Sequence, residues 1–181
     1  MKVLELLPIG NLDAGLLNDL GPALSHCLQV PCSVVSGRMD PAFAFHRERQ
    51  QYHSSEILLA MQDIVTANTW RVLGIATADL YIPILTFVFG EAQMGGPCAV
   101  VSIHRLRQEF YGLPSNSALL HQRLRKEALH EVGHTLDLVH CEDYQCAMSP
   151  SHAVEWIDLK GDELCRFCSE RVLSKKSSAC P

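Results

Sequence analysis

Short apolar runs alternate with stretches whose apolar residues recur at helical spacing. Residues 2–9 carry an alternating apolar run that predicts a first strand. Residues 12–28 place a leucine at every fourth position from Leu16 onward, which predicts a helix, although Pro22 could break it. Residues 30–35 predict a second strand. The pattern therefore predicts strands and helices in alternation.

The middle of the chain is less regular. Residues 36–53 mix glycine, proline, charged and aromatic residues, which indicates an exposed loop. Residues 55–65 predict a helix that a serine can cap. Two β-branched apolar runs, residues 71–76 and 84–89, are typical of central strands with a turn between them. A glycine-rich connection then leads to another predicted strand over residues 98–103.

A long predicted helix over residues 115–136 carries the strongest chemical signal in the sequence. His130 and His134 are four residues apart, so a helix places both imidazoles on one face. Two imidazoles so placed can bind one Zn²⁺, and Glu131 between them can reach a water molecule on that ion. The alternative is a surface helix that carries two histidines by chance.

A catalytic zinc site of this kind needs a third protein ligand and one open position. His140 follows His134 by six residues and can supply that ligand if the helix ends near residues 136–137 and the chain turns back. Glu155 stands where a different class of zinc peptidase places a glutamate ligand, but the cysteines beside His140 favour the histidine. The sequence thus predicts a zinc hydrolase in which Glu131 acts as general base and acid.

The motif His-Glu-x-x-His with a third histidine six residues on is followed by Cys-x4-Cys-x-Met and later by Cys-x2-Cys. In these motifs, residues 130–168 resemble the archaemetzincins, a family of metzincin zinc peptidases. The resemblance implies that Met148 lies on a tight turn beneath the metal without touching it. One position departs from the family, because Asp137 stands where glycine is usual. Aspartate adopts left-handed backbone more readily than most residues, so we expect the turn to survive.

The chain has eight cysteines and no recognisable signal peptide, which favours metal binding in a reducing compartment over disulfides. Four of them form two close pairs at the spacing of a four-thiolate zinc site: Cys141, Cys146, Cys165 and Cys168. A disulfide and redox chemistry are the alternatives. The sequence therefore predicts two zinc ions per chain, one catalytic and one structural. Of the other cysteines, we expect core thiols at Cys27, Cys32 and Cys98 and a frayed position at Cys180.

The resemblance implies an α/β (α+β), metzincin-like fold with a mixed twisted sheet, a long active-site helix and a small zinc-stabilised C-terminal lobe. A single domain, residues 1–181, would divide into an upper lobe (1–137) and a lower lobe (138–181). The strand after the glycine-rich connection would be the antiparallel edge, so residues 96–102 would offer free backbone groups to an extended peptide. A merely exposed hairpin is the alternative. Residues 174–181 are expected to form a solvated tail.

The predicted function is zinc-dependent hydrolysis of peptide bonds, by an endopeptidase or an aminopeptidase. A metal-containing peptide-binding or assembly module and a zinc amidase for small molecules are the alternatives. The net charge of −5 argues against nucleic acid as the main partner, and no apolar stretch is long enough to span a membrane. We expect a monomeric, cytoplasmic protein. Ordinary surface or core positions are expected for His104, His121 and His152, although each could approach the cleft, and for Tyr144, for which a contact with an oxyanion is the alternative.

Overall fold

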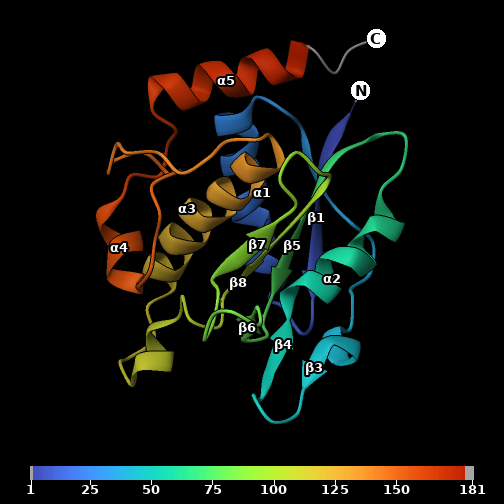
Figure 1. Cartoon of the computed structure of the whole chain (residues 1–181), viewed down its shortest axis with the longest axis vertical. Coiled ribbons are helices and arrows are strands. Elements are labelled where there is room, and N and C mark those ends of the chain that lie inside the picture. Colours follow the sequence, from blue (N-terminus) through green and yellow to red (C-terminus); the bar gives the residue numbers. More distant parts are fainter. Residues whose placement is uncertain (1, 178–181) are drawn as a thin grey trace.

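A twisted five-stranded sheet runs through the computed structural model, which describes residues 2–177 (Figure 1). Neighbouring strands are parallel except at one edge, where the last strand is antiparallel. The spatial order is β2 (Cys32–Val34), β1 (Val3–Ile9), β5 (Thr69–Ala76), β8 (Cys98–Ser102) and β7 (Gly90–Ala92). This mixed sheet, with helices packed on it, confirms the predicted fold class.

Helices cover both faces of this sheet. Helices α1 (Ala14–Leu28) and α3 (Ser117–Thr135) pack on one face, and α2 (Ser54–Met61) packs on the other (Figure 1). Successive strand residues point to opposite faces, so Leu73 of β5 joins the core with α1 and α3 while Val72 joins the core with α2. An unbroken apolar strand such as β5 is therefore central and buried on both sides.

Helix α1 continues through Pro22, so the predicted break does not occur. The side chain of Asp13 caps its first turn by accepting a hydrogen bond from the backbone N–H of Gly15 at 2.9 Å. Pro22 and Asn18, whose carbonyl loses its helical partner, both lie on the exposed face. Solvent can replace that lost bond, so the helix tolerates the proline.

The prediction of an exposed loop over residues 36–53 was wrong in its second half. A 3₁₀ helix occupies Pro41–Ala44, and a second, three-stranded sheet follows. Its strands are β3 (Phe45–His46), β4 (Gln51–His53) and β6 (Leu80–Tyr81). Strands of two or three residues are too short for an alternating pattern to be recognised.

Residues 84–89 do not form the predicted strand, and the predicted edge strand is not at the edge. Strand β8 lies between β5 and β7, and pairs with both of them. The edge strands are β2 and β7, and the antiparallel edge is β7, so residues 90–92 replace residues 96–102 as the antiparallel edge. An apolar run alone does not distinguish a strand from a loop that lines a cavity, and Ile84 in this run is 86% exposed.

Two helices follow the third histidine, α4 (Val154–Leu159) and α5 (Arg166–Ser177). The predicted tail is therefore helical up to residue 177, because Val172 anchors α5 in the core at 2% exposure. Cys180 and the rest of that tail lie outside the described residues. Within residues 2–177, no helix combines the length and apolar character needed to cross a membrane. The single domain and its division at residue 137 stay predictions.

Candidate active site

Helix α3 is held at both ends. The side chain of Asn116 caps its start by accepting a hydrogen bond from Leu119 N–H at 3.0 Å. At its end, the Arg71 guanidinium of β5 donates to the carbonyl of Thr135 from Nε at 3.2 Å and from Nη2 at 3.1 Å. Such a cation satisfies a carbonyl that has no partner within the helix. The helix end is thus fixed to the central strand.

The chain turns back immediately after this end. Asp137 adopts the left-handed conformation with φ 60°, and the N–H of Leu138 donates to the carbonyl of Gly133 at 3.1 Å. The carboxylate of Asp137 also pairs with Lys175 of α5 at 2.6 Å. The expected turn therefore forms with aspartate in place of glycine, and it brings His140 back towards the helix.

The three predicted zinc ligands lie together. Each of His130, His134 and His140 offers one ring nitrogen, and these nitrogens lie within 4.8 Å of one another. The Nε2 atoms of His130 and His134 are 3.0 Å apart. Two nitrogens on one tetrahedral zinc ion lie about 3.3 Å apart, so the spacing fits that ion.

Hydrogen bonds on the far side of the rings fix which nitrogens face one another. Nδ1 of His130 lies 2.9 Å from the carbonyl of Ala147, and Nδ1 of His134 lies 2.7 Å from the carbonyl of Leu138. A carbonyl only accepts, so each Nδ1 donates and each Nε2 presents its lone pair. Burial, with the nearby Lys160 ammonium, lowers the pKa of His130 well below its usual value. Neutral rings of this tautomer can bind a metal.

Glu131 lies within the same cavity, against the edge strand. A Cβ added to Gly90 of β7 would lie 2.7 Å from Oε1 of Glu131, so glycine is required for this close approach. Burial raises the pKa of the Glu131 carboxyl well above its usual value, the charge of Glu127 adds to the rise, and Lys160 opposes it. A carboxylate in such surroundings is a stronger base than an exposed one.

Met148 packs directly beneath this turn of the helix. It is fully buried, and a Cβ added to Gly133 would collide with its Sδ atom. The carbonyl of Met148 accepts a hydrogen bond from Cys141 N–H at 3.0 Å, which ties the methionine segment to the residue after His140. Met148 thus packs against the helix that carries His130 and His134 and is not one of the grouped metal-binding residues, while its supporting role stays a prediction.

Gly133→Ala is expected to destabilise the protein by about 1–3 kcal/mol, because the added methyl group overpacks the contact with Met148. Chemical denaturation measures the change. Gly15→Ala in the exposed first turn of α1 is the matched control, since the nearest atom to its new Cβ is Asp13 Oδ1 at 3.4 Å. The control should be neutral or slightly stabilising. Equal effects of the two changes would contradict the packing argument.

The four predicted thiolate ligands also lie together, with their Sγ atoms within 4.8 Å of one another. The Sγ atoms of Cys141 and Cys165 are 3.8 Å apart. A disulfide holds its sulfurs at about 2.05 Å, whereas two thiolates on one zinc ion lie about 3.8 Å apart. This spacing fits a structural zinc ion and does not fit a disulfide between these two residues.

The remaining described cysteines lie outside this cluster. Cys98 is fully buried as expected, but Cys27 and Cys32 are only half-buried at the rim of the core. Burial raises the pKa of both Cys32 and Cys98 to about 11, so these thiols stay protonated at neutral pH.

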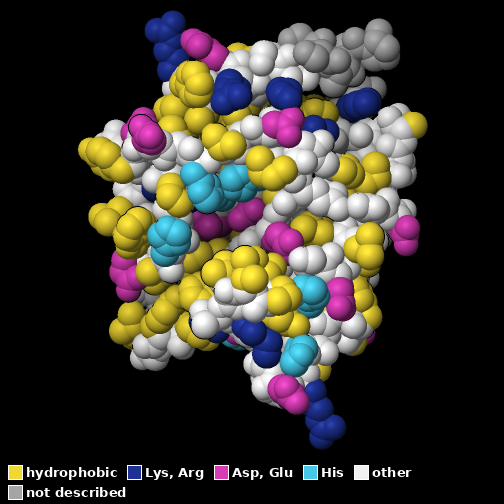
Figure 2. All heavy atoms as spheres, in the orientation of Figure 1, with side chains coloured by type: hydrophobic (Ala, Val, Ile, Leu, Met, Phe, Trp, Pro, Cys, Tyr) yellow, Lys and Arg dark blue, Asp and Glu magenta, His cyan; other side chains and the backbone are white. Residues whose placement is uncertain are grey.

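The histidines and Glu131 open into a cavity of about 530 Å³. Figure 2 shows a hollow on this face with acidic side chains inside it, histidines on one side and hydrophobic side chains on the other. Its walls come from α3, from β7, from residues 82–89 and from residues 150–152. His152 lines the cavity, contrary to expectation, whereas His104, His121, Tyr144 and Glu155 are not among the lining residues.

A buried ion pair in the cavity wall was not predicted from the sequence. Glu127 and Lys160 are 2.7 Å apart, and their side chains are 4% and 2% exposed. Glu127 precedes Glu131 by four residues, so the helical spacing placed it on the same face. No local pattern indicates its partner, because Lys160 comes from the end of α4 and also donates to the Ser149 carbonyl at 3.2 Å.

The fold and the histidine-lined cavity are those of a zinc-dependent metallopeptidase. The model of Peptidase family M54 matches residues 29–174. The chain belongs to this family. It is 37% identical to the archaemetzincin of Thermococcus kodakarensis, over 96% of each chain. It is 36% identical to that of Methanocaldococcus jannaschii, over 91% of this chain and 89% of the relative.

Solved structures agree with these sequence matches. The zinc-dependent peptidase of Methanocorpusculum labreanum superposes with a TM-score of 0.84 at 29% identity, over 93% of this chain and 99% of the other. The archaemetzincin of Methanopyrus kandleri superposes with a TM-score of 0.81 at 31% identity, over 96% of each chain. The predicted family and enzyme class are thereby confirmed, while the roles of individual residues stay predictions.

Proposed function

We propose that this metallopeptidase hydrolyses peptide bonds with zinc bound by His130, His134 and His140 and with Glu131 as general base and acid. The observation that carries the proposal is the convergence of three ring nitrogens beside one buried carboxylate in a single cavity. Zinc in such a site supplies Lewis acidity and lowers the pKa of water to near 7. Three histidine ligands would leave a fourth position on such an ion for water and the substrate.

The role of Glu131 follows from its place on the helix. It lies between two ligand histidines, within the cavity and against the edge strand. Its raised basicity suits it to accept a proton from the attacking water and to return that proton to the leaving amine. The neighbouring Glu127 is paired with Lys160 and is therefore not available for this transfer.

The substrate would bind as an extended segment along β7. This strand is the last of the five-stranded sheet, and its residues line the cavity beside Glu131. A peptide that adds to a free strand edge gains main-chain hydrogen bonds whatever its sequence. An endopeptidase and an aminopeptidase both fit this mode of binding.

Cleavage of a random peptide mixture tests the proposal. The zinc-loaded protein should release new amino termini, chelation should stop the release, and added zinc should restore it. Absence of cleavage with intact peptide binding would instead favour a peptide-binding module. Cleavage of acyl-amino acids and small amides alone would favour a zinc amidase.

Two equivalents of zinc per chain are expected, because the four cysteines form a second site. Chelator should remove one equivalent quickly and the other slowly, since the histidine site is open to the cavity while the thiolate site is closed. Elemental analysis before and after timed chelation measures both. A single equivalent, or two that leave at the same rate, would contradict the assignment of two different sites.

A further inference from the structure

Residues 82–89, here called the cleft loop, form the apolar wall of the cavity opposite the histidines. Its lining side chains are those of Ile82, Leu85, Thr86, Phe87, Val88 and Phe89. Figure 2 shows this wall as a hydrophobic cluster along the hollow. Leu85 remains 50% exposed, so its side chain is available to a ligand.

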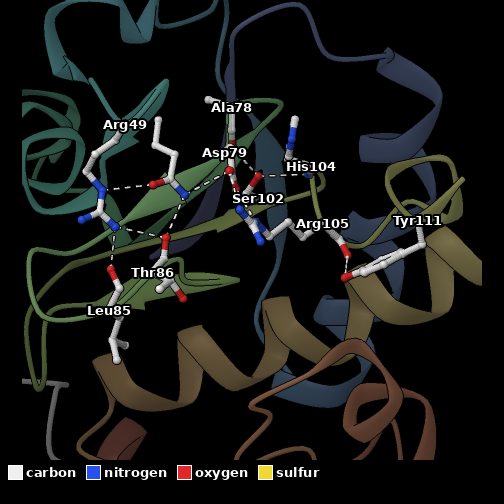
Figure 3. A network of polar contacts seen from close by, with 10 residues as sticks. Arg49, Ala78, Asp79, Leu85, Thr86, Ser102, His104, Arg105 and Tyr111 are labelled. Carbon is white, nitrogen blue, oxygen red and sulfur yellow. Dashed lines mark hydrogen bonds and ion pairs between the residues drawn. The ribbon is translucent and has the colours of Figure 1, made fainter. Parts of the chain in front are cut away.

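Strand pairing contributes little to the shape of this loop. Within it, the sheet makes an isolated bridge between Val88 and Leu80. Side chains from β4 and the preceding turn bind its backbone instead, as Figure 3 shows. Nη2 of Arg49 donates to the carbonyls of Leu85 at 2.7 Å and Thr86 at 3.1 Å. Nη2 carries two N–H groups, so one charged donor atom fixes two successive peptide groups at once.

Arg49 is itself fixed from two sides. Its guanidinium lies 4.2 Å from the centre of the Tyr81 ring, and its Nε donates to Oε1 of Gln51 at 3.1 Å. The amide of Gln51 in turn donates to the Thr86 carbonyl at 2.9 Å and to Asp79 Oδ2 at 3.0 Å. The hydrogen bonds to the loop therefore come from side chains with little freedom to move.

A second arginine holds the other end of the loop. Arg105 makes a two-point contact with the carboxylate of Asp79, at 2.6 and 2.8 Å (Figure 3). Its guanidinium lies 4.2 Å from the centre of the Phe87 ring. Arg49, Gln51, Asp79 and Arg105 thus form one polar network behind the cleft loop. Because this network holds the backbone, Leu85 can face the cavity without packing into the core, whereas Phe89 at the other end of the loop is 5% exposed and belongs to the core.

We propose that the cleft loop is a substrate subsite for a large aliphatic or aromatic side chain next to the scissile bond, and that Arg49 is the residue that positions it. This inference rests on the proposed peptide hydrolysis and names its substrate class. Apolar lining next to a few polar groups is the usual character of a binding site. In an apolar pocket, one methylene group more or less on the substrate changes kcat/KM by about 10- to 200-fold.

The subsite is tested with paired peptides that differ only by Phe or Ala beside the cleaved bond. The wild type should show at least a tenfold higher kcat/KM for the Phe peptide. Leu85→Ala should reduce this ratio several-fold, whereas Ile84→Ala should not change it. Ile84 is the matched control because it lies in the same loop, is 86% exposed and does not line the cavity. Equal losses in both variants would overturn the subsite.

The positioning role is tested by Arg49→Ala, with Arg47→Ala as the exposed control from the same turn. Arg49→Ala should raise KM for the Phe peptide and bring the Phe-to-Ala ratio near one, while kcat/KM for the Ala peptide stays within twofold. A merely structural effect of the substitution would lower kcat/KM for both peptides by the same factor. Zinc content and thermal unfolding identify a variant that fails to fold. Arg49→Lys should give a partial loss, because an ammonium group can still donate to the loop carbonyls but has neither the Nε donor to Gln51 nor the planar group over Tyr81.

The two proposals fail in different ways. If the wild type cleaves both peptides equally, the subsite is wrong and the hydrolase stands. If it cleaves neither, the proposed hydrolysis is wrong, and the Kd of each peptide for zinc-loaded Glu131→Gln decides the subsite. Tighter binding of the Phe peptide, lost on adding Arg49→Ala, would support it, and equal Kd values would overturn it.

Discussion

Glu131→Gln should lower the rate of peptide cleavage by at least about a hundredfold while leaving the fold and zinc content unchanged. A glutamine amide has the shape of the carboxyl group but cannot accept the proton of the attacking water, and general base catalysis contributes about 10²–10⁴-fold. The amide fits the same buried space beside Gly90. Single-turnover cleavage, elemental analysis and thermal unfolding give the three readouts.

Glu155→Gln is the control for this experiment. Glu155 is exposed on α4 and does not line the cavity. It is also the residue that would be the third zinc ligand in the alternative class of zinc peptidase. The control should retain full activity and both zinc ions. If the control loses activity or zinc, or if Glu131→Gln cleaves at the wild-type rate, the assignment of base and ligands is wrong.

The grouping of the three histidines was predictable because it depends on local spacing. His130 and His134 share a helix face by the geometry of the helix itself, and one left-handed residue at Asp137 is enough to return His140 to them. The cysteine pairs likewise meet through short connections. The metal-binding roles proposed for the histidines and cysteines rest on the family match and on the chemistry of their donor atoms as well as on the distances.

The cavity walls were not predictable, because they depend on partners far apart in the sequence. The run of residues 84–89 has the composition of a strand, yet the guanidinium of Arg49 binds its carbonyls from more than thirty residues upstream. Lys160 reaches Glu127 from a separate helix in the same way. Contacts between residues so far apart produce no periodic pattern of apolar residues, so they cannot be predicted from the periodicity that identifies helices and strands.

The edge strand shows how one such error spreads. The resemblance implied that the strand after the glycine-rich connection, β8, is the antiparallel edge, whereas the chain forms this edge from Gly90–Ala92, within the predicted connection. Gly90, which was assigned to the glycine-rich connection, is required as glycine in this strand, because Glu131 occupies the space that a side chain at this position would fill. The predicted peptide-binding edge therefore moves to the strand nearest the carboxylate.

Cys146→Ser should remove one zinc equivalent per chain and lower the melting temperature by about 10 °C or more. Cys146 is 1% exposed, is one of the four clustered cysteines and belongs to the same core cluster as Met148, so the change would leave an incomplete metal site and a poorly matched hydroxyl. Structural zinc contributes about 10–16 kcal/mol to folding in small zinc peptides. Losing even about 4 kcal/mol of this would shift the melting temperature by about 8–16 °C in a chain of this size.

The same substitution at Cys27 separates metal loss from loss of a thiol. Cys27 is half-buried beside the core and belongs to neither metal group, so Cys27→Ser should keep both zinc ions and melt within a few degrees of the wild type. Cys146→Ser should also lose peptide cleavage, because Met148 and the carbonyl of Ala147, which orients His130, lie in the segment that the thiolates hold. A variant that lost its structural zinc yet kept the wild-type melting temperature and activity would show that the four cysteines do not stabilise the catalytic histidines.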